Sequence, residues 1–201
     1  MANARAGAAV LDGHPRETTD RPNPAPLLRR PAPVALIASG AAALAFMTGP
    51  SGSRAVVAAF MAGVLVVLAA TDLERRIIPN RIVLPATAIV LVANVVVSPG
   101  RSLDFVLATL AVGLVFLIPA LINPSLMGMG DVKLMMLLGA GLGWGAVGAV
   151  MVAFVAMFPF ALATLIRGGV AARKASLPFG PFLALGGLVL LLAPHLVIHG
   201  N

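Results

Sequence analysis

Residues 103–122, LDFVLATLAVGLVFLIPALI, form an apolar run in which Asp104 is the single charged residue. A helix of this length extends about 30 Å, which matches the hydrocarbon core of a lipid bilayer. Across the whole chain 60% of the residues are hydrophobic, 10% are charged, and the mean hydropathy is +1.02. These values lie far from those of soluble domains, so the sequence predicts a membrane protein.

Six more apolar runs flank this central stretch, and each predicts a further helix: residues 34–47, 55–71, 82–97, 132–142, 146–166 and 179–198. The run at 132–142 is too short to cross a bilayer alone. It is expected to be tilted, packed inside the bundle or joined to the next run through the glycines at 141–145. We therefore predict an all-α, polytopic transmembrane bundle of six or seven spans, forming one domain over residues 34–201.

Residues 1–33 differ sharply in composition, with six prolines, five arginines, three acids and no aromatic residue. Such a segment buries too little apolar surface to offset the entropy of ordering, so we predict a disordered tail. The chain has no cysteine, which excludes disulfides and thiolate metal sites. Its net charge of +7 is scattered between apolar runs, a pattern that predicts contact with membrane lipids and no nucleic-acid partner.

The basic residues predict an orientation. With seven spans and a cytoplasmic N-terminus, two arginines, Arg54 and Arg101, face outward. Twelve basic residues then face the cytoplasm: Arg5, Arg16, Arg21, Arg29, Arg30, Arg75, Arg76, Arg81, Lys133, Arg167, Arg173 and Lys174. An excess of Lys and Arg marks the cytoplasmic side of a membrane protein. The arrangement indicates a multi-pass protein of the cell membrane, and the richness in Ala, Gly and Arg suggests a bacterial source.

Four acids remain beyond the tail: Asp72, Glu74, Asp104 and Asp131. A carboxylate beside a membrane span is costly and is a functional candidate by default. Asp104 follows the short 100–102 connection and is most simply explained as a first-turn residue favoured by the helix dipole. Glu74 lies two residues from Asp72, so it points to another side of the helix.

Asp72 ends an apolar run in the segment ATDLERRIIPN, residues 70–80. A purely structural explanation is an interfacial acid paired with Arg75 or Arg76, one helical turn away. Pro79 would stop the preceding helix, and Asn80 would cap the following one.

Asp131 lies in the segment NPSLMGMGDVK, residues 123–133. Its structural explanation is an N-cap for a helix that begins at Val132, with Gly128 and Gly130 forming the turn. The glycines would equally leave bare backbone against which an extended peptide could lie. Lys133 would hold nearby negative charge or extend towards the lipid headgroups.

Together, Asp72 and Asp131 can form the pair of carboxyls that peptide hydrolysis requires. Two adjacent carboxyls share a proton, so that the ionised one draws a proton from water and the other donates to the scissile carbonyl. This chemistry needs no metal or cofactor. His195 and His199 are four residues apart and could form a metal pair, but no third ligand is evident, and a helix-end role fits them better.

Three segments in order resemble the type IV prepilin peptidases, a family of aspartic peptidases with a glycine-x-glycine-aspartate signature. They are Asp72 with Pro79 and Asn80, the stretch from Gly128 to Leu134, and residues 177–186, LPFGPFLALG. The resemblance implies that Asp72 and Asp131 are the catalytic residues of an endopeptidase that removes leader peptides from prepilin or pseudopilin precursors at the cytoplasmic membrane face. It implies supporting roles for Pro79, Asn80, Gly128, Gly130 and Lys133.

Bifunctional members of that family have an added N-terminal region, often with paired cysteines, and they methylate the new N-terminus. This chain has only a tail and two spans before Asp72, so we expect cleavage without methylation. A small proton-coupled transporter and a non-catalytic secretion-assembly subunit are the alternative functions. The sequence does not identify the prepilin, the aspartate that acts as the base, the role of the tail or the oligomeric state.

Overall fold

The computed structural model describes residues 31–48, 52–123, 127–168 and 179–193. Seven α-helices occupy these ranges, together with two short 3₁₀ turns and no strand. The helices are α1 Pro31–Thr48, α2 Ser53–Arg75, α3 Asn80–Val97, α4 Ser102–Ile122, α5 Met129–Leu142, α6 Ala146–Gly168 and α7 Gly180–Leu192, and the turns are η2 Pro99–Arg101 and η3 Gly143–Gly145. The all-α bundle predicted from the apolar runs is therefore confirmed.

The helix boundaries agree with the predicted runs to within a few residues, apart from the ends of the chain. Helix α1 begins at Pro31, three residues before the predicted Val34, because proline is tolerated in the first turn of a helix. Helix α7 ends at Leu192 with Ala193 as its C-cap, and residues 194–198 of the predicted run lie outside the described residues. Residues 1–30, the greater part of the predicted tail, also lie outside them.

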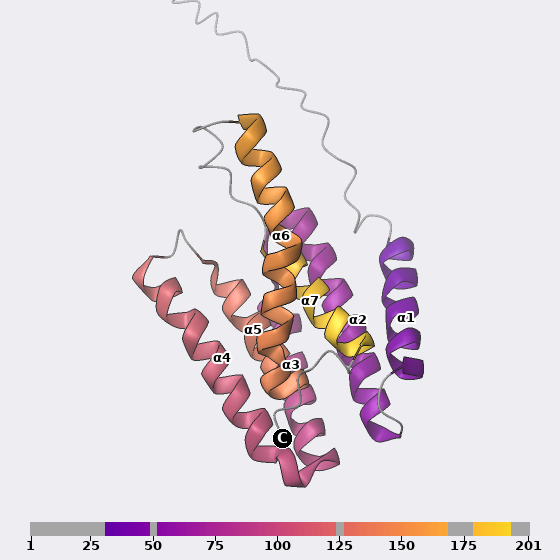
Figure 1. The fold of residues 1–201 in the computed structure, drawn as a ribbon. Coiled ribbons are helices and arrows are strands. Elements are labelled where there is room, and N and C mark those ends of the chain that lie inside the picture. Colours follow the sequence, from indigo (N-terminus) through magenta and orange to yellow (C-terminus); the bar gives the residue numbers. More distant parts are fainter. Residues whose placement is uncertain (1–30, 49–51, 124–126, 169–178, 194–201) are drawn as a thin grey trace, which may run out of the picture.

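The short run at 132–142 is a separate helix that folds back against its neighbour. Gly143, with φ 58°, ends α5 in a backbone conformation that suits glycine, and η3 leads into α6. Helices α5 and α6 run in opposite directions, as Figure 1 shows. The glycines at 141–145 thus form the turn of a hairpin.

Four stretches are long and apolar enough to cross a membrane: Ser53–Arg75, Asn80–Val97, Pro99–Ile122 and Met129–Thr164, the last of which contains the hairpin of α5 and α6 and is therefore not one straight span. Two shorter apolar helices, Ala32–Thr48 and Gly180–Leu192, accompany them. Large apolar side chains point outward from the bundle, for example Val92 at 62% and Val115 at 63% exposure. An apolar exterior of this kind suits contact with lipid tails.

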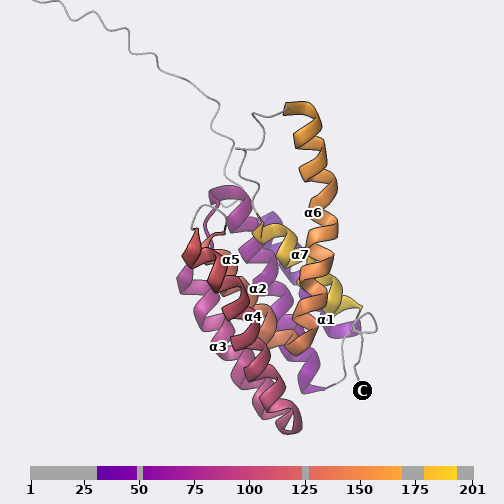
Figure 2. The same ribbon diagram turned by 60° about the vertical axis from the view of Figure 1, so that its left-hand side comes forward.

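The helix ends form two distinct faces of the bundle (Figures 1 and 2). At one face, Arg54 donates from Nε to Ser98 Oγ at 3.0 Å, and Arg101 pairs with Asp104 at 3.7 Å. The end of α2 and the starts of α3, α5 and α7 meet at the opposite face. The structure thus separates Arg54 and Arg101 from Asp72 and Asp131, and it places Asp104 in the first turn of α4.

Helices α2, α5 and α7 supply most of the fully buried side chains. Leu65 of α2, Met135 and Leu138 of α5, and Leu183 of α7 are all less than 2% exposed. Asn94 of α3 is a buried polar group that donates from Nδ2 to the carbonyl of Ala140 at 2.8 Å. It satisfies a carbonyl that the end of α5 leaves without an intrahelical partner.

Glycine allows α5 to lie directly against the backbone of α4. A Cβ on Gly139 would lie 2.8 Å from Thr109 Cα and 2.9 Å from the carbonyl oxygen of Ala108. Backbone cannot move aside as a flexible side chain can. Small residues at such crossings let helices pack closely in lipid, where apolar burial between helices brings little gain.

We expect Gly139→Ala to lower the free energy of unfolding by about 1–3 kcal/mol, the usual cost of overpacking. Gly63→Ala is the matched control, because a Cβ at Gly63 of α2 meets nothing within 4 Å. That control should be neutral or slightly stabilising, since alanine favours the helix by about 1 kcal/mol over glycine. Denaturation of the purified protein in detergent would compare the two. Equal stability of both variants would contradict the packing seen at Gly139.

Candidate active site

Asp72 and Asp131 lie on different helices and line the same pocket. Asp72 is in the last turn of α2, and Asp131 is in the first turn of α5. The pocket has a volume of about 330 Å³, within the range of small ligand sites. Its other lining residues are Arg76, Ile77, Ile78, Asn80, Gly128, Met129, Gly130 and Lys133. The fold thus brings together two segments that are separated by two helices in the chain.

Asp72 is almost fully enclosed, with 7% of its surface exposed. Its carboxylate accepts a hydrogen bond from the backbone N–H of Gly180, at the start of α7. The contact is so close that a Cβ on Gly180 would lie 2.5 Å from Asp72 Oδ2. The missing side chain of Gly180 is therefore what makes room for the carboxylate.

Asp131 is not the N-cap of α5, as its structural explanation had expected. The helix begins at Met129 with Gly128 as the N-cap, so Asp131 is the third helical residue. Its carboxylate accepts the backbone N–H of Gly128. This is the acidic half of a capping box, in which the third residue reaches back to the N-cap amide. The expectation of a helix starting at Val132 was wrong because the two glycines already belong to the helix and its cap.

A hydrogen bond joins the start of α3 to the start of α5 across the pocket. Lys133 donates from Nζ to Asn80 Oδ1 at 2.6 Å. Asn80 is the first residue of α3, and Pro79 occupies the N-cap position without a side-chain cap, so the expectation that Asn80 caps this helix was wrong. Its amide faces Lys133 instead. Pro79 is a neighbour of the pocket in the chain, but it is not one of the lining residues.

The side chain of Ile78 packs between the chain segment after α2 and the starts of α5 and α7. Its side chain is 7% exposed. A Cβ on Gly130 would lie 3.0 Å from Ile78 Cβ, and a Cβ on Gly180 would lie 3.3 Å from Ile78 Cδ1. Ile78 thus fills the space beside both glycines and packs the first loop against the starts of α5 and α7.

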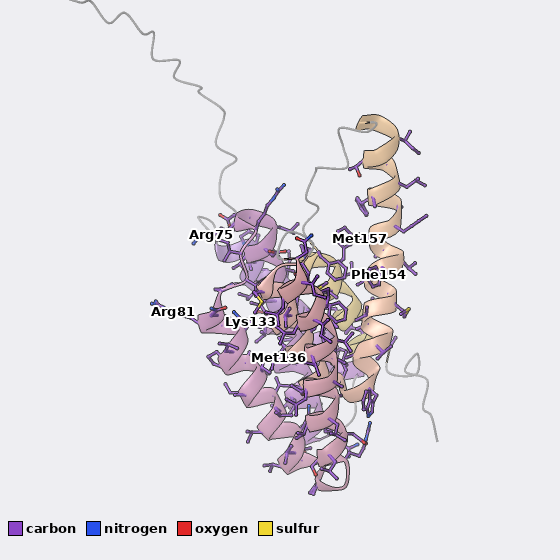
Figure 3. All side chains as sticks on the ribbon, turned by 90° about the vertical axis from the view of Figure 1, so that its left-hand side faces the viewer. Arg75, Arg81, Lys133, Met136, Phe154 and Met157 are labelled. Carbon is purple, nitrogen blue, oxygen red and sulfur yellow. The ribbon has the colours of Figure 1, made fainter. Side chains whose placement is uncertain are left out.

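The basic side chains near the site lie on the part of the bundle away from α6. Figure 3 shows Arg75, Arg81 and Lys133 on one side, and Phe154 and Met157 of α6 on the other. Phe154 of α6 contacts Phe179 just before α7, with ring centroids 5.4 Å apart. The aromatic pair lies at the chain segment that leads into Gly180.

No group of three His, Asp or Glu side chains that could hold a metal ion occurs among the residues that the structure describes. His195 and His199, which were considered as a metal pair, lie outside the described residues, as does His14. The charged groups of the pocket are the two aspartates with Arg76 and Lys133.

The two carboxyls are close enough for the charge of Asp72 to act on Asp131. Two carboxyls in such proximity do not readily carry two negative charges, and sharing one proton gives one acid and one base. The arrangement can therefore activate a water molecule and protonate a carbonyl oxygen in the same pocket. Six predicted site residues gather here: Asp72, Asp131, Asn80, Gly128, Gly130 and Lys133.

Three residues of the site were not predicted from the sequence: Arg76, Ile78 and Gly180. Arg76 and Ile78 lie inside the first motif, and Gly180 lies inside the third. Since each has an ordinary explanation as a surface charge, an apolar residue or a helix start, only their contacts with the aspartates and glycines set them apart. The available sequence clue was that all three residues lie within segments that resemble the prepilin peptidases.

The profile of the Type IV leader peptidase family matches residues 59–170, which include both aspartates. The chain belongs to this family. It is also 35% identical over 165 residues to proteins described as prepilin leader peptidase/N-methyltransferase in two strains of Burkholderia pseudomallei, 1026b and K96243. No solved structure matches the chain.

Those alignments cover 77% of this leader peptidase family member but 52% of each relative. The chain thus spans about half the length of the curated relatives it matches. The membership supports a protease that is embedded in a membrane by several apolar helices.

If Asp72 takes part in peptide cleavage, we expect Gly180→Ala to reduce the cleavage rate by about 100-fold, because an added Cβ pushes the Asp72 carboxylate out of place and small displacements of reacting groups cost that much. Gly148→Ala is the matched control on α6, where a Cβ would meet Leu190 Cδ1 at an ordinary 3.5 Å. Cleavage would be followed by gel shift at equal membrane levels. Equal rates for the two variants would contradict the role assigned to Gly180.

Proposed function

We propose that this protein is an aspartic endopeptidase of the bacterial cell membrane that removes the leader peptide from type IV prepilin or pseudopilin precursors. The observation that carries the proposal is the meeting of Asp72 and Asp131, from separate helices, in one pocket where the charge of one acts on the other. Family membership and the prepilin leader peptidases of Burkholderia pseudomallei support the substrate class.

In the proposed reaction, an ionised carboxylate of the pair removes a proton from a water molecule as the water oxygen attacks the scissile carbonyl carbon. The protonated carboxyl donates its proton to the carbonyl oxygen. Gly128 provides backbone without a side chain beside Asp131, which leaves space for an extended peptide, whereas Ile78 fills the space beside Gly130. The hydrogen bond from Lys133 to Asn80 joins the starts of α3 and α5, which form walls of the pocket.

The substrate is expected to combine an apolar helix with a polar leader. The helix enters the bilayer and lies among the spans, while the leader crosses the two loops at the membrane surface. Leader removal then occurs after a glycine that precedes the apolar helix, as the family resemblance implies. The lining of the pocket, with two isoleucines and Met129 beside the charged groups, suits a junction between polar and apolar segments.

The active site is proposed to face the cytoplasm, with the N-terminus on the same side. Arg75, Arg76, Arg81 and Lys133 lie at or near the end of the bundle that holds the aspartates, whereas Arg54 lies at the opposite end with Arg101. A basic surface on the cytoplasmic side is attracted to anionic headgroups, which would keep the site at the membrane edge.

Cleavage without methylation is the finer part of the proposal. The 201 residues contain no cysteine, whereas bifunctional members often carry paired cysteines in an added region. After incubation with S-adenosylmethionine, mass spectrometry of the processed pilin is expected to give the unmodified mass of the new N-terminus. A mass increase of one methyl group would overturn this part alone.

The central test is the expression of the protein in membranes with a prepilin encoded in the same genome, in its native form and as Asp72→Asn and Asp131→Asn. We expect both substitutions to lower the cleavage rate by at least about 100-fold, the smaller end of the usual contribution from a general acid or base. Asp104→Asn is the control, because Asp104 pairs with Arg101 at the far end of the bundle.

Gel shift and mass spectrometry would be read at equal membrane levels of all four proteins. Cleavage that persists in either aspartate variant would rule out the two-aspartate mechanism. If the native protein cleaves no prepilin from its genome, the peptidase proposal fails and a proton-coupled transporter or an assembly subunit takes its place.

A further inference from the structure

Arg76 has an unusual backbone conformation for its residue type. It is the single non-glycine residue with positive φ in the described part of the chain, at φ 52° and ψ 36°, and its N–H donates to the carbonyl of Asp72 at 2.8 Å. The left-handed region is unfavourable for L-residues with a long side chain, and glycine is the common residue at this point of a helix end. An arginine at this position points to a functional role for its side chain.

The side chain of Arg76 reaches the active site, whereas that of its neighbour is not part of the pocket. Arg76 lines the pocket with both aspartates, and its positive charge acts on Asp72. Arg75 lies in the last turn of α2 and is not among the lining residues. The left-handed turn at the end of α2 therefore leaves the exposed side chain of Arg76, and not that of Arg75, lining the pocket that holds Asp72.

The helix ends around the two aspartates favour a negative charge on Asp131 more than on Asp72. Asp72 accepts the N–H of Gly180 at the start of α7, and Asp131 accepts the N–H of Gly128 at the start of α5. Each carboxylate thus has one helix N-terminus, which favours negative charge. Asp72 also lies at the negative C-terminal end of its own helix. A full positive charge on Arg76 outweighs that end, which is equivalent to about half an elementary charge.

Among the residues that the structure describes, no comparable cation is directed at Asp131. The charge that acts on it is that of Asp72, and the other pocket cation, Lys133, donates to Asn80 at 2.6 Å. Glu74 lies two positions along α2, which places it on another side of the helix from Asp72. Arg81 of α3 is exposed and is not among the lining residues, and α7 contributes no charged side chain to the pocket.

We propose that Arg76 makes the aspartate pair unequal, so that Asp72 is the ionised base and Asp131 the protonated acid. This inference rests on the peptidase function proposed above and assigns the two roles within it. Arg76 acts through Asp72 and is a positioning residue.

The roles give a balanced reaction. As the water oxygen bonds to the scissile carbon, Asp72 takes a water proton and Asp131 gives its proton to the carbonyl oxygen. When the carbon–nitrogen bond breaks, Asp72 passes its proton to the leaving amine and Asp131 recovers a proton from a hydroxyl of the intermediate. Both carboxyls return to their starting states.

The test is the dependence of the cleavage rate on pH, measured with the full chain in proteoliposomes and the same prepilin. Without the charge of Arg76, Asp72 ionises less readily. In Arg76→Gln and Arg76→Gly the acid limb of the profile is expected to move upward by about one pH unit, with a loss of about tenfold in rate at the acid end. Arg76→Lys keeps a cation and should retain most of the native profile, and Arg75→Gln should match the native protein.

The glycine variant separates a charge effect from a structural one. Glycine suits the backbone at position 76, so Arg76→Gly should unfold at the native temperature or above it and should accumulate even if Arg76→Gln does not. A role confined to ending the helix would leave the profile of Arg76→Gly unchanged.

An acid limb that stays in place in Arg76→Gly while the native protein cleaves normally would overturn this inference alone. Absence of cleavage by the native protein would overturn the proposed function and this inference with it.

Discussion

A buried carboxylate at the edge of an apolar bundle is the constraint around which the site is built. Asp72 is 7% exposed, and an enclosed carboxylate is costly unless hydrogen bonds and opposite charge surround it. Its partners come from three places: the N–H of Gly180, the charge of Arg76 and the shared pocket with Asp131. Satisfying this one group requires the end of α2 and the starts of α5 and α7 to meet.

Glycine residues make this close approach of the helices possible, and a side chain added at these positions would disrupt it. Gly180 leaves space for the Asp72 carboxylate, Gly130 lies against Ile78, and Gly139 lets α5 lie on the backbone of α4. In lipid, burial of apolar surface between helices brings little gain, so close packing and hydrogen bonds must hold the bundle together. The same contacts that stabilise the helices therefore set the geometry of the two aspartates.

The pocket combines features that a soluble enzyme would distribute differently. Charged and polar groups line one part of it, while Ile77, Ile78 and Met129 give it an apolar part. A peptide that changes from polar to apolar at the scissile bond fits such a lining better than a uniformly polar one does.

The sequence by itself determined the all-α membrane bundle, the positions of its helices and the two candidate aspartates, because apolar runs and isolated acids are local properties of the chain. Helix starts were less predictable: the structural explanations made Asp131 and Asn80 N-caps, whereas Gly128 and Pro79 hold those positions. An interaction of Asp72 with Arg76 was anticipated from their spacing of four residues, but only the tertiary structure showed that Gly180 contacts Asp72 and that Ile78 packs against Gly130 and Gly180. Such contacts depend on how distant helices approach one another, which no local pattern records.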